Sequence, residues 1–151
     1  MASLKNFLLE KGYTAVPLTL TNTNHFEVEV IINDIQGRFI VDTGASSTCI
    51  GRDCIEHFDL IAEDSDIRAA GAGATNMVTQ IAKKNSLKIG DWQRKKVKFV
   101  LFDLTHVNAA LTMHNALPVH GILGADILSR SRSIIDYKGK KLYLKNSKRK
   151  K

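Results

Sequence analysis

The sequence has few cysteines, few prolines and no long apolar segment. Its two cysteines, Cys49 and Cys54, are too few for a disulfide-stabilised scaffold, so we expect reduced and mostly buried thiols. Two prolines and ten glycines in 151 residues leave no linker composition. No apolar run approaches the roughly 20 residues that cross a bilayer, and the first eleven residues are too short and too charged for a signal peptide. These absences predict one cytoplasmic domain with no membrane partner.

The excess of positive charge lies at the C-terminus. The formal net charge is +7, but residues 138–151 hold eight of the 22 Lys and Arg and no acidic residue. Residues 1–137 hold 14 basic and 15 acidic residues and are nearly neutral. We therefore expect an N-terminal segment over residues 1–13, a folded domain over 14–145 and a solvated basic tail over 146–151. Nucleic acid is not an expected partner, and weak binding of polyanions by the tail is the least favoured function.

Short runs of Val, Ile, Thr and Phe between turn residues predict a mostly β protein. The expected strands cover residues 14–20, 25–33 and 38–41, with a hairpin of 86–89 and 96–102 around Gly90-Asp91. Helical spacing is confined to short segments within residues 52–60, 107–117 and 125–130. Turns every 8 to 12 residues favour a small barrel or sandwich over a parallel α/β sheet.

An apolar strand, Phe39-Ile40-Val41, delivers the carboxylate of Asp42 into a turn of small residues. A charge at a buried strand end is costly unless it is hydrogen-bonded or functional. Gly44 has no Cβ and lets a backbone N–H approach the carboxylate, while Thr43 and Ser46 supply hydroxyls. Taken alone, the Asp-Thr-Gly turn fits an Asx turn that closes a hairpin as well as it fits a catalytic site.

A second segment favours the catalytic interpretation. About 80 residues after Asp42, an apolar pair ends at a glycine and a short helix follows. The two segments together resemble the retropepsin-like aspartic proteases, single-domain relatives of pepsin and the retroviral proteases. The residues that carry the resemblance are Ile40-Val41-Asp42-Thr43-Gly44-Ala45-Ser46 and Ile122-Leu123-Gly124. The resemblance covers residues 18–144 and implies an all-β fold, a small closed barrel with one to three short helices, that hydrolyses peptide bonds.

The resemblance also implies a flap between the two motifs. Residues 66–78 are expected to form two strands joined by a glycine-rich tip that folds over a bound peptide, and the tip residues are Ala70, Gly71, Ala72, Gly73 and Ala74. The tip departs from the pepsin relatives because it has no aromatic residue like their flap tyrosine. A phosphate loop is the other explanation for these glycines. It is disfavoured because residues 77–81 continue as a strand and no Lys-Ser/Thr follows.

Aspartic-protease chemistry needs two carboxylates that share one proton, and this chain has one Asp-Thr-Gly turn. Asp103, Asp126 and Asp136 lack such a turn, and Asp126 is expected to cap the helix that begins at Ala125. The second carboxylate should therefore come from a second copy of the chain, in a homodimer that places both Asp42 residues at the two-fold axis. No metal or cofactor is required.

The resemblance assigns roles to the residues around Asp42. Thr43 would hold the two active-site turns together across the axis, and Ser46 would support the outer carboxyl oxygen. The other residues of the two motifs would support the site; they are Gly44, Ala45, Ile122, Leu123 and Gly124. A hairpin of residues 133–137 and 141–144 is a candidate interface, because relatives pair such strands between subunits, but it could equally pack on its own core.

Two further patterns carry little functional weight. His25, Glu27 and Glu29 alternate along one strand; zinc is conceivable with such ligands, but a solvated outer face explains the pattern better. The basic stretch of residues 94–98 is interpreted as an exposed edge that discourages aggregation. We therefore predict a cytoplasmic, homodimeric aspartic endopeptidase acting on a peptide or protein substrate. The alternative is a non-catalytic peptide- or protein-binding module on the same barrel.

Overall fold

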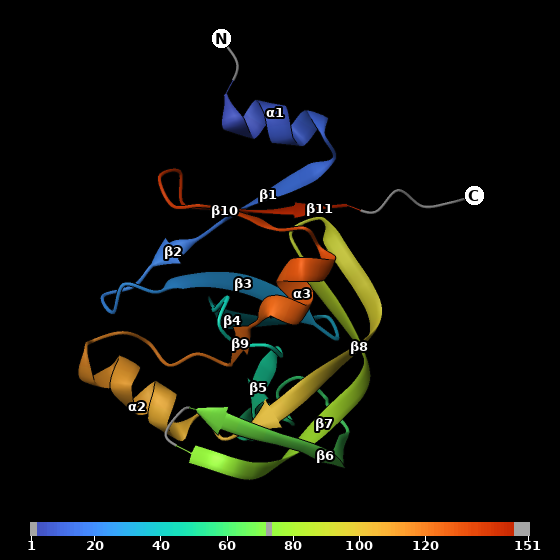
Figure 1. The fold of residues 1–151 in the computed structure, drawn as a ribbon, viewed down its shortest axis with the longest axis vertical. Helices are drawn as coiled ribbons and strands as arrows, with labels where there is room; N and C mark the ends of the chain where they lie inside the picture. The colour runs from blue at the N-terminus through green and yellow to red at the C-terminus, as the bar shows by residue number, and fades with distance from the viewer. Residues whose placement is uncertain (1–2, 72–73, 147–151) are drawn as a thin grey trace.

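A computed structural model describes residues 3–71 and 74–146 of the chain (Figure 1). The helices within these residues are α1 (Leu4–Glu10), α2 (Thr105–Met113), α3 (Ala125–Arg130) and the 3₁₀ helix η1 (Arg52–Cys54). The strands are β1 (Tyr13–Pro17), β2 (Thr19–Leu20), β3 (Phe26–Ile32), β4 (Ile35–Val41), β5 (Cys49–Gly51), β6 (Ala62–Gly71), β7 (Ala74–Ile89), β8 (Trp92–Phe102), β9 (Gly121–Leu123), β10 (Ile134–Asp136) and β11 (Lys141–Lys145). None of the helices in the described ranges has the length and hydropathy to cross a membrane.

The main sheet closes on itself. Its strand order is β2-β3-β4-β9-β5-β8-β7-β6, and β3 also pairs with β7 through Ile31–Lys88 and Ile32–Leu87. That pairing joins β3, β4, β9, β5, β8 and β7 into a ring, which confirms the expected small closed barrel with short helices. In Figure 1, α2 lies beside the lower part of the barrel and α3 in front of its centre.

Alternating side chains fill the barrel. On β3, Val28, Val30 and Ile32 are buried while Glu29 is exposed, as expected for a strand with one face against the core. The largest fully buried side chains include Trp92, Phe39, Phe58 and Phe99, which come from β4, the turns after η1 and β8. Burial of aromatic side chains of this size supplies much of the hydrophobic stabilisation of a small domain.

A second, three-stranded sheet has the order β1-β11-β10. The expected hairpin is formed by β10 and β11, with Ile135 paired to Leu142. Leu142 and Leu144 are fully buried in the main core, and β1 covers the other side of β11. The hairpin therefore packs on its own subunit, while β10 remains at the edge of this sheet.

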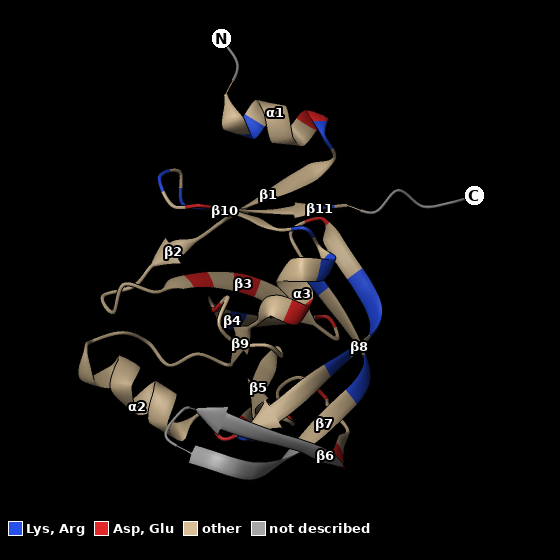
Figure 2. Ribbon diagram, in the orientation of Figure 1, with Lys and Arg blue, Asp and Glu red and all other residues tan. Residues whose placement is uncertain are grey.

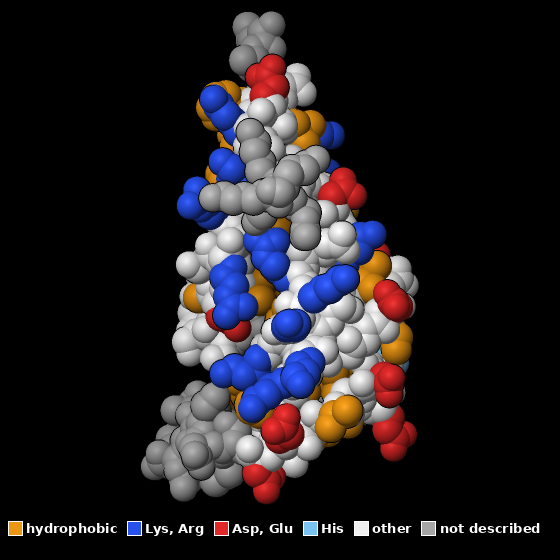
Figure 3. Space-filling model, turned by 90° about the vertical axis from the view of Figure 1, so that its right-hand side faces the viewer, with side chains coloured by type: hydrophobic (Ala, Val, Ile, Leu, Met, Phe, Trp, Pro, Cys, Tyr) orange, Lys and Arg blue, Asp and Glu red, His pale blue; other side chains and the backbone are white. Residues whose placement is uncertain are grey.

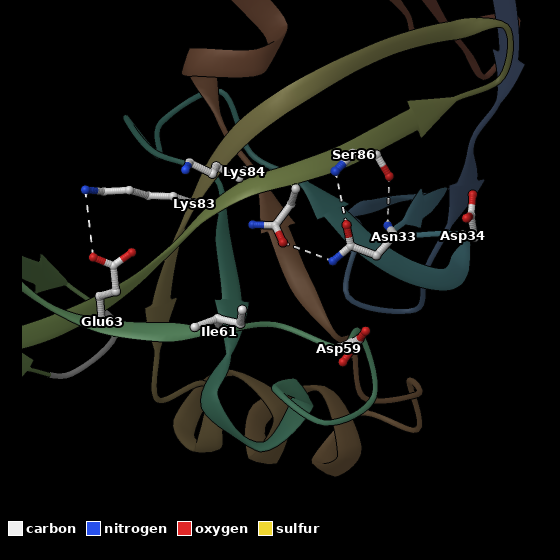
Figure 4. Close-up of a pocket in the computed structure, with 9 residues that line it drawn as sticks. Asn33, Asp34, Asp59, Ile61, Glu63, Lys83, Lys84 and Ser86 are labelled. Carbon is white, nitrogen blue, oxygen red and sulfur yellow. Dashed lines mark hydrogen bonds and ion pairs between the residues drawn. The ribbon is translucent and has the colours of Figure 1, made fainter.

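A hydrogen-bonded latch ties the β3–β4 turn to β7 (Figure 4). The Asn33 side chain donates to Phe58 O and Asn85 Oδ1, each at 2.9 Å, and accepts from the Ser86 N–H at 3.1 Å. Asn33 has φ of 51°, in the left-handed region that asparagine tolerates better than most residues. The Asn33 side chain thus pairs with two backbone groups, Phe58 O and the Ser86 N–H. These hydrogen bonds stabilise a turn that the sequence identifies only by its Asn-Asp pair.

The described structure corrects four expectations about local structure. The strand expected over residues 14–20 is two strands in different sheets, because Pro17 ends β1 and the Leu18 N–H donates to Lys140 O. The helix expected over residues 52–60 is reduced to η1 and following turns, and Asp59 there has φ of 55°. Helix α1 was not expected. Its N-cap Ser3 accepts a hydrogen bond from the Asn6 N–H at 3.0 Å.

The fourth correction concerns Glu27, which does not belong to a solvated row. Its side chain is buried, and its Oε1 lies 3.2 Å from Arg38 Nε on the neighbouring strand β4. Burial raises the pKa of Glu27, and the positive charge of Arg38 opposes that change. Alternation along β3 placed the residue on the correct face, but the cation that makes its burial tolerable lies on another strand.

Candidate active site

The Asp42 carboxylate stands at the end of β4, in a turn held by backbone hydrogen bonds. The Asp42 N–H donates to Leu123 O at 3.0 Å, and the Ala45 N–H donates to Asp42 O at 3.2 Å. The Gly44 N–H donates to Asp42 Oδ1 at 2.8 Å. The Asp42 side chain is exposed in the single chain. The turn therefore orients one carboxylate toward solvent, where a second molecule can reach it.

Strand β9 runs beneath this turn, between β4 and β5. It pairs in parallel with β4 through Val41–Leu123 and antiparallel with β5 through Ile50–Gly121. Gly124 follows β9 at a very close approach, because a Cβ there would lie 2.7 Å from Ala45 O. The Ala125 N–H also donates to Ala45 O, at 2.7 Å. The glycine of the second motif is thus needed for the two segments to touch.

Asp126 and Thr48 hold the far end of the loop that carries Asp42 through side-chain hydrogen bonds. Asp126 Oδ1 accepts hydrogen bonds from the Thr48 N–H at 3.0 Å and from Thr48 Oγ1 at 2.7 Å. Thr48 Oγ1 in turn accepts from the Gly124 N–H at 3.0 Å. Gly124 occupies the N-cap position of α3, and Asp126 is the second residue of that helix, where its Oδ1 also accepts from the Ile127 N–H at 2.8 Å. The same carboxylate supports the loop that carries Asp42.

The two apolar residues before Asp42 face different clusters. Val41 packs against the main core, whereas Ile40 is buried with Leu111 and Val119 in a separate cluster beside α2. Alternation along β4 therefore anchors the catalytic strand on both faces. The Asn108 side chain fixes α2 in place by donating to Val119 O at 3.1 Å and accepting from the Val119 N–H at 2.8 Å.

A cleft of about 670 Å³ opens beside Asp42. Apolar side chains from β4, β9 and α2 form part of it, and the β2–β3 turn forms the rest. The lining residues are Asn22, Thr23, Asn24, His25, Ile40, Asp42, Val107, Ala110, Leu111, His114 and Ile122. Asn22 Nδ2 donates to Asn115 O at 3.4 Å and links the turn to the segment after α2. A volume of this size accommodates several groups of a peptide.

The predicted site residues are only partly brought together in one chain. The residues of the second motif, Ile122, Leu123 and Gly124, lie directly against the Asp42 turn. Thr43 and Ser46 are exposed, and within the described ranges no hydrogen bond joins Ser46 to the Asp42 carboxylate. Their assigned roles therefore remain predictions. Asp42 is the single carboxylate among the residues that line the cleft.

The structure describes part of the expected flap. Strands β6 and β7 form the expected hairpin, and Gly71 pairs with Ala74 at its narrow end. Ala70 belongs to β6, whereas Ala72 and Gly73 lie outside the described residues. The contact of these residues with substrate remains a prediction.

Sequence reasoning missed Thr48 and the residues of α2. Thr48 lies only six positions after Asp42 and carries a hydroxyl, which was the available signal for a supporting role. The wall formed by Val107, Ala110 and Leu111 had no comparable signal, because short apolar helices occur in most domains.

The two cysteine thiols and the arrangement of possible metal ligands do not favour a different kind of site. Burial, together with the charges of Asp126 and Asp42, raises the pKa of the Cys49 thiol to about 11. Burial, together with Asp53, raises the pKa of the Cys54 thiol to about 12. Both thiols are therefore protonated near neutral pH and are poor nucleophiles. In the part of the chain that the structure describes, no three His, Cys, Asp or Glu side chains are grouped to hold a metal ion.

Three solved structures are similar to this chain over most of its length. A retropepsin-like aspartic protease from Rickettsia conorii is 21% identical, with a TM-score of 0.55 over 88% of this chain and 90% of that chain. The retroviral protease-like domain of Ddi1 from Leishmania major is 18% identical, with a TM-score of 0.54 over 85% and 92%. EIAV protease in complex with the inhibitor HBY-793 is 21% identical, with a TM-score of 0.50 over 69% and 85%.

The family assignment comes from the sequence of the barrel itself. No curated protein gave a significant match to the chain. The family model described as aspartyl protease matches residues 28–127, a range that contains the Asp42 turn, β9 and the start of α3. The chain therefore belongs to the aspartyl protease family.

Proposed function

We propose that two copies of this chain form a homodimeric aspartic endopeptidase, with one Asp42 from each copy. The observation that carries the proposal is a single exposed carboxylate, held by the Gly44 N–H at the end of an apolar cleft. The family membership and the retropepsin-like fold support it. The cleft supports a peptide or protein substrate, since its apolar wall suits side chains and its Asn and His rim suits backbone amides.

The proposed mechanism uses the two carboxylates in different protonation states. The ionised Asp42 takes a proton from a water molecule held between the pair, and the water oxygen bonds to the carbonyl carbon of the substrate. The protonated Asp42 of the other copy gives its proton to the carbonyl oxygen. When the carbon–nitrogen bond breaks, the amine nitrogen leaves with a proton returned by the first carboxyl group. One hydroxyl proton of the tetrahedral diol goes back to the second carboxylate, which leaves a carboxylic acid product and restores the single proton on the pair. Two like charges at short distance cannot both ionise cheaply, which keeps one proton on the pair.

Substitution of Asp42 tests this proposal. The Asp42→Asn variant should lose peptide cleavage by at least about 10³-fold, while its unfolding curve stays close to that of the wild type. The matched control is Asp91→Asn, at the β7–β8 turn, which should keep full cleavage. A peptide library incubated with the wild-type protein provides the substrate. Binding of peptides without any cleavage by the dimer, or cleavage that survives Asp42→Asn, would contradict the proposal.

A further inference from the structure

One outer side of the barrel, which we call the basic face, carries half of the Lys and Arg found in residues 1–137. Seven of the 14 Lys and Arg in residues 1–137 lie on the β7–β8 hairpin, and the single acidic residue between positions 82 and 102 is Asp91 at its turn. The basic face consists of Lys83, Lys84, Lys88, Arg94, Lys95, Lys96 and Lys98. The inward residues of the hairpin, such as Leu87, Trp92 and Phe99, are fully buried, so the charged side chains lie on the outer surface.

The positive charge continues beyond the hairpin onto the second sheet. The β7–β8 turn lies against β1, since a Cβ at Gly90 would lie 2.7 Å from Val16 Cγ2. A surface depression between the segment before β1, the end of α3 and the end of β11 is lined by four basic residues and one acidic residue, Lys11, Arg130, Arg132, Lys145 and Glu10, with Gly12 and Asn146. Figure 3 shows Lys and Arg side chains gathered down this side of the molecule, with Asp and Glu mainly at its margins. Figure 2 places the same charge along β7 and β8.

The arrangement costs stability, which favours a functional explanation. Ala82 pairs with Phe99, and Lys83 and Lys98 are the next residues on the two strands, so like charges adjoin across the hairpin. Lys84 and Lys96 have φ of 62° and 59°, at the register shifts of the hairpin. This left-handed conformation is unfavourable for lysine and common for glycine. A bulge changes the direction in which the side chains of its strand point. In this hairpin both bulges carry a lysine with positive φ.

Protection of a sheet edge does not account for the whole face. It explains the lysines of β8, whose first half has β7 as its strand partner in the described structure. It does not explain Lys88 on β7, because this residue pairs with Gln93 of β8 on one side and with Ile31 of β3 on the other. Of the six lysines, Lys83 alone forms an ion pair in the described part of the chain, with Glu63 at 3.9 Å.

We propose that the basic face binds the phosphate backbone of a nucleic acid without sequence preference. The ammonium group of lysine attracts phosphate as a point charge. At the usual rise of a strand, the distance from Lys83 to Lys88 along β7 is about 17 Å. A duplex presents about one phosphate per 1.7 Å of its axis, so this length meets several phosphates. The one tryptophan is fully buried, so the face offers no indole for base stacking. Specific protein interfaces are depleted in lysine, which disfavours a protein partner.

This inference departs from the expectation drawn from composition. The near-neutral total of residues 1–137 concealed the face, because acidic residues elsewhere in the domain cancel its charge in the sum. Binding at the basic face is also separate from the proposed peptidase activity. None of its residues lines the cleft beside Asp42.

The test measures binding of the full-length protein to a labelled 24-base-pair DNA duplex of arbitrary sequence, by fluorescence anisotropy at increasing NaCl. We expect log K to fall linearly with log salt, with a slope of roughly −0.9 for each phosphate contact. The triple variant Lys83→Gln, Lys95→Gln, Lys98→Gln should bind roughly 10- to 100-fold more weakly near 0.15 M salt and show a slope shallower by about 2 to 3.

A matched control removes the same charge elsewhere. Lys5→Gln, Lys138→Gln, Lys140→Gln alters α1 and the β10–β11 loop, which lies away from the basic face in Figure 2, and should change affinity less than threefold. Equal losses in both triple variants would overturn the proposal, as would loss only on neutralising Lys148, Arg149, Lys150 and Lys151. Binding to vesicles with 30% phosphatidylserine but not to the duplex would also overturn it. Circular dichroism melting checks that each variant folds, and none of these readouts depends on peptidase activity.

Discussion

His57 and His120 stack face to face, with ring centroids 4.8 Å apart and an angle of 3° between the rings. His120 Nδ1 accepts a hydrogen bond from the Arg38 N–H at 3.0 Å, so this nitrogen carries no proton in the folded chain. Burial lowers the pKa of His120, and the charges of His57 and Arg38 lower it further, while Asp53 opposes them. His120 directly precedes β9 and contacts β4 through Arg38, and both strands lead to the Asp42 turn.

The stacked pair predicts a loss of stability in mild acid. A histidine with a lowered pKa in the folded state stabilises the protein fully above the unfolded value of about 6.5, and that contribution is lost as pH falls below it. We expect His120→Asn to flatten the dependence of unfolding free energy on pH between about 6.5 and 5, because asparagine does not titrate. The Asn oxygen can still accept from the Arg38 N–H, so the variant keeps that hydrogen bond. Urea unfolding at a series of pH values measures this.

The comparison between variants isolates His120. Glu27 acts in the opposite direction, because burial raises its pKa and its contribution falls as pH rises. The control His106→Gln, at an exposed position, should keep the slope of the wild type. An identical pH slope in His120→Asn and the wild type would contradict the assignment.

The Thr48 hydroxyl predicts a large effect for a small substitution. Thr48→Val keeps the shape but removes the hydrogen bond to Asp126 and leaves the buried Gly124 N–H without its acceptor. We expect a loss of about 2–3 kcal/mol in unfolding free energy, together with reduced peptide cleavage. Chemical denaturation measures the first effect. Thr48→Ser keeps the hydroxyl and should lose less than about 1 kcal/mol; equal losses in both variants would exclude the hydrogen bonds as the cause.

Gly124→Ala tests the close approach beneath the catalytic turn. The added methyl group would lie 2.7 Å from Ala45 O and 2.9 Å from Ser47 C, and both are backbone atoms that move only with the loop. We expect a loss of about 1–3 kcal/mol in unfolding free energy and weaker cleavage. Gly139→Ala is the comparison, since its close neighbour is the end of the Asp136 side chain. Wild-type stability and activity in Gly124→Ala would show that the approach is looser than described.

Ala110→Trp tests whether peptides occupy the cleft. Ala110 is an exposed residue of α2 that lines the cleft, so a larger side chain should fill the space beside Asp42 with little effect on folding. We expect kcat/KM for peptide substrates to fall at least about tenfold, which corresponds to about 1.4 kcal/mol. Ala109→Trp, one position away and outside the cleft lining, is the control. Equal rates in both variants would place the substrate elsewhere.

The residues at the centre of the site could be predicted from the sequence more fully than the residues that surround them. The Asp42 turn and Gly124 were identifiable because their chemistry needs particular residues at particular positions, a carboxylate in a tight turn and a glycine at a close approach. The contact of Asp126 with the Asp42 loop was not predicted because its partner, Thr48, lies 78 positions away, and only the fold brings them together. The same reason hid the Arg38 partner that buries Glu27. Local patterns describe a strand or a turn, but partners on other strands depend on register, which they do not encode.

The shared site between two copies is tested most directly by mixing subunits. Wild-type chains are equilibrated with a threefold excess of Asp42→Asn chains, and peptide cleavage is measured per wild-type chain. If each active site needs Asp42 from both copies, random pairing lowers this activity to about one quarter. The same mixture made with Asp91→Asn chains, which are active themselves, should keep the wild-type activity per total chain. Activity per wild-type chain that stays constant in the Asp42→Asn mixture, while the chains are shown to exchange, would contradict the account.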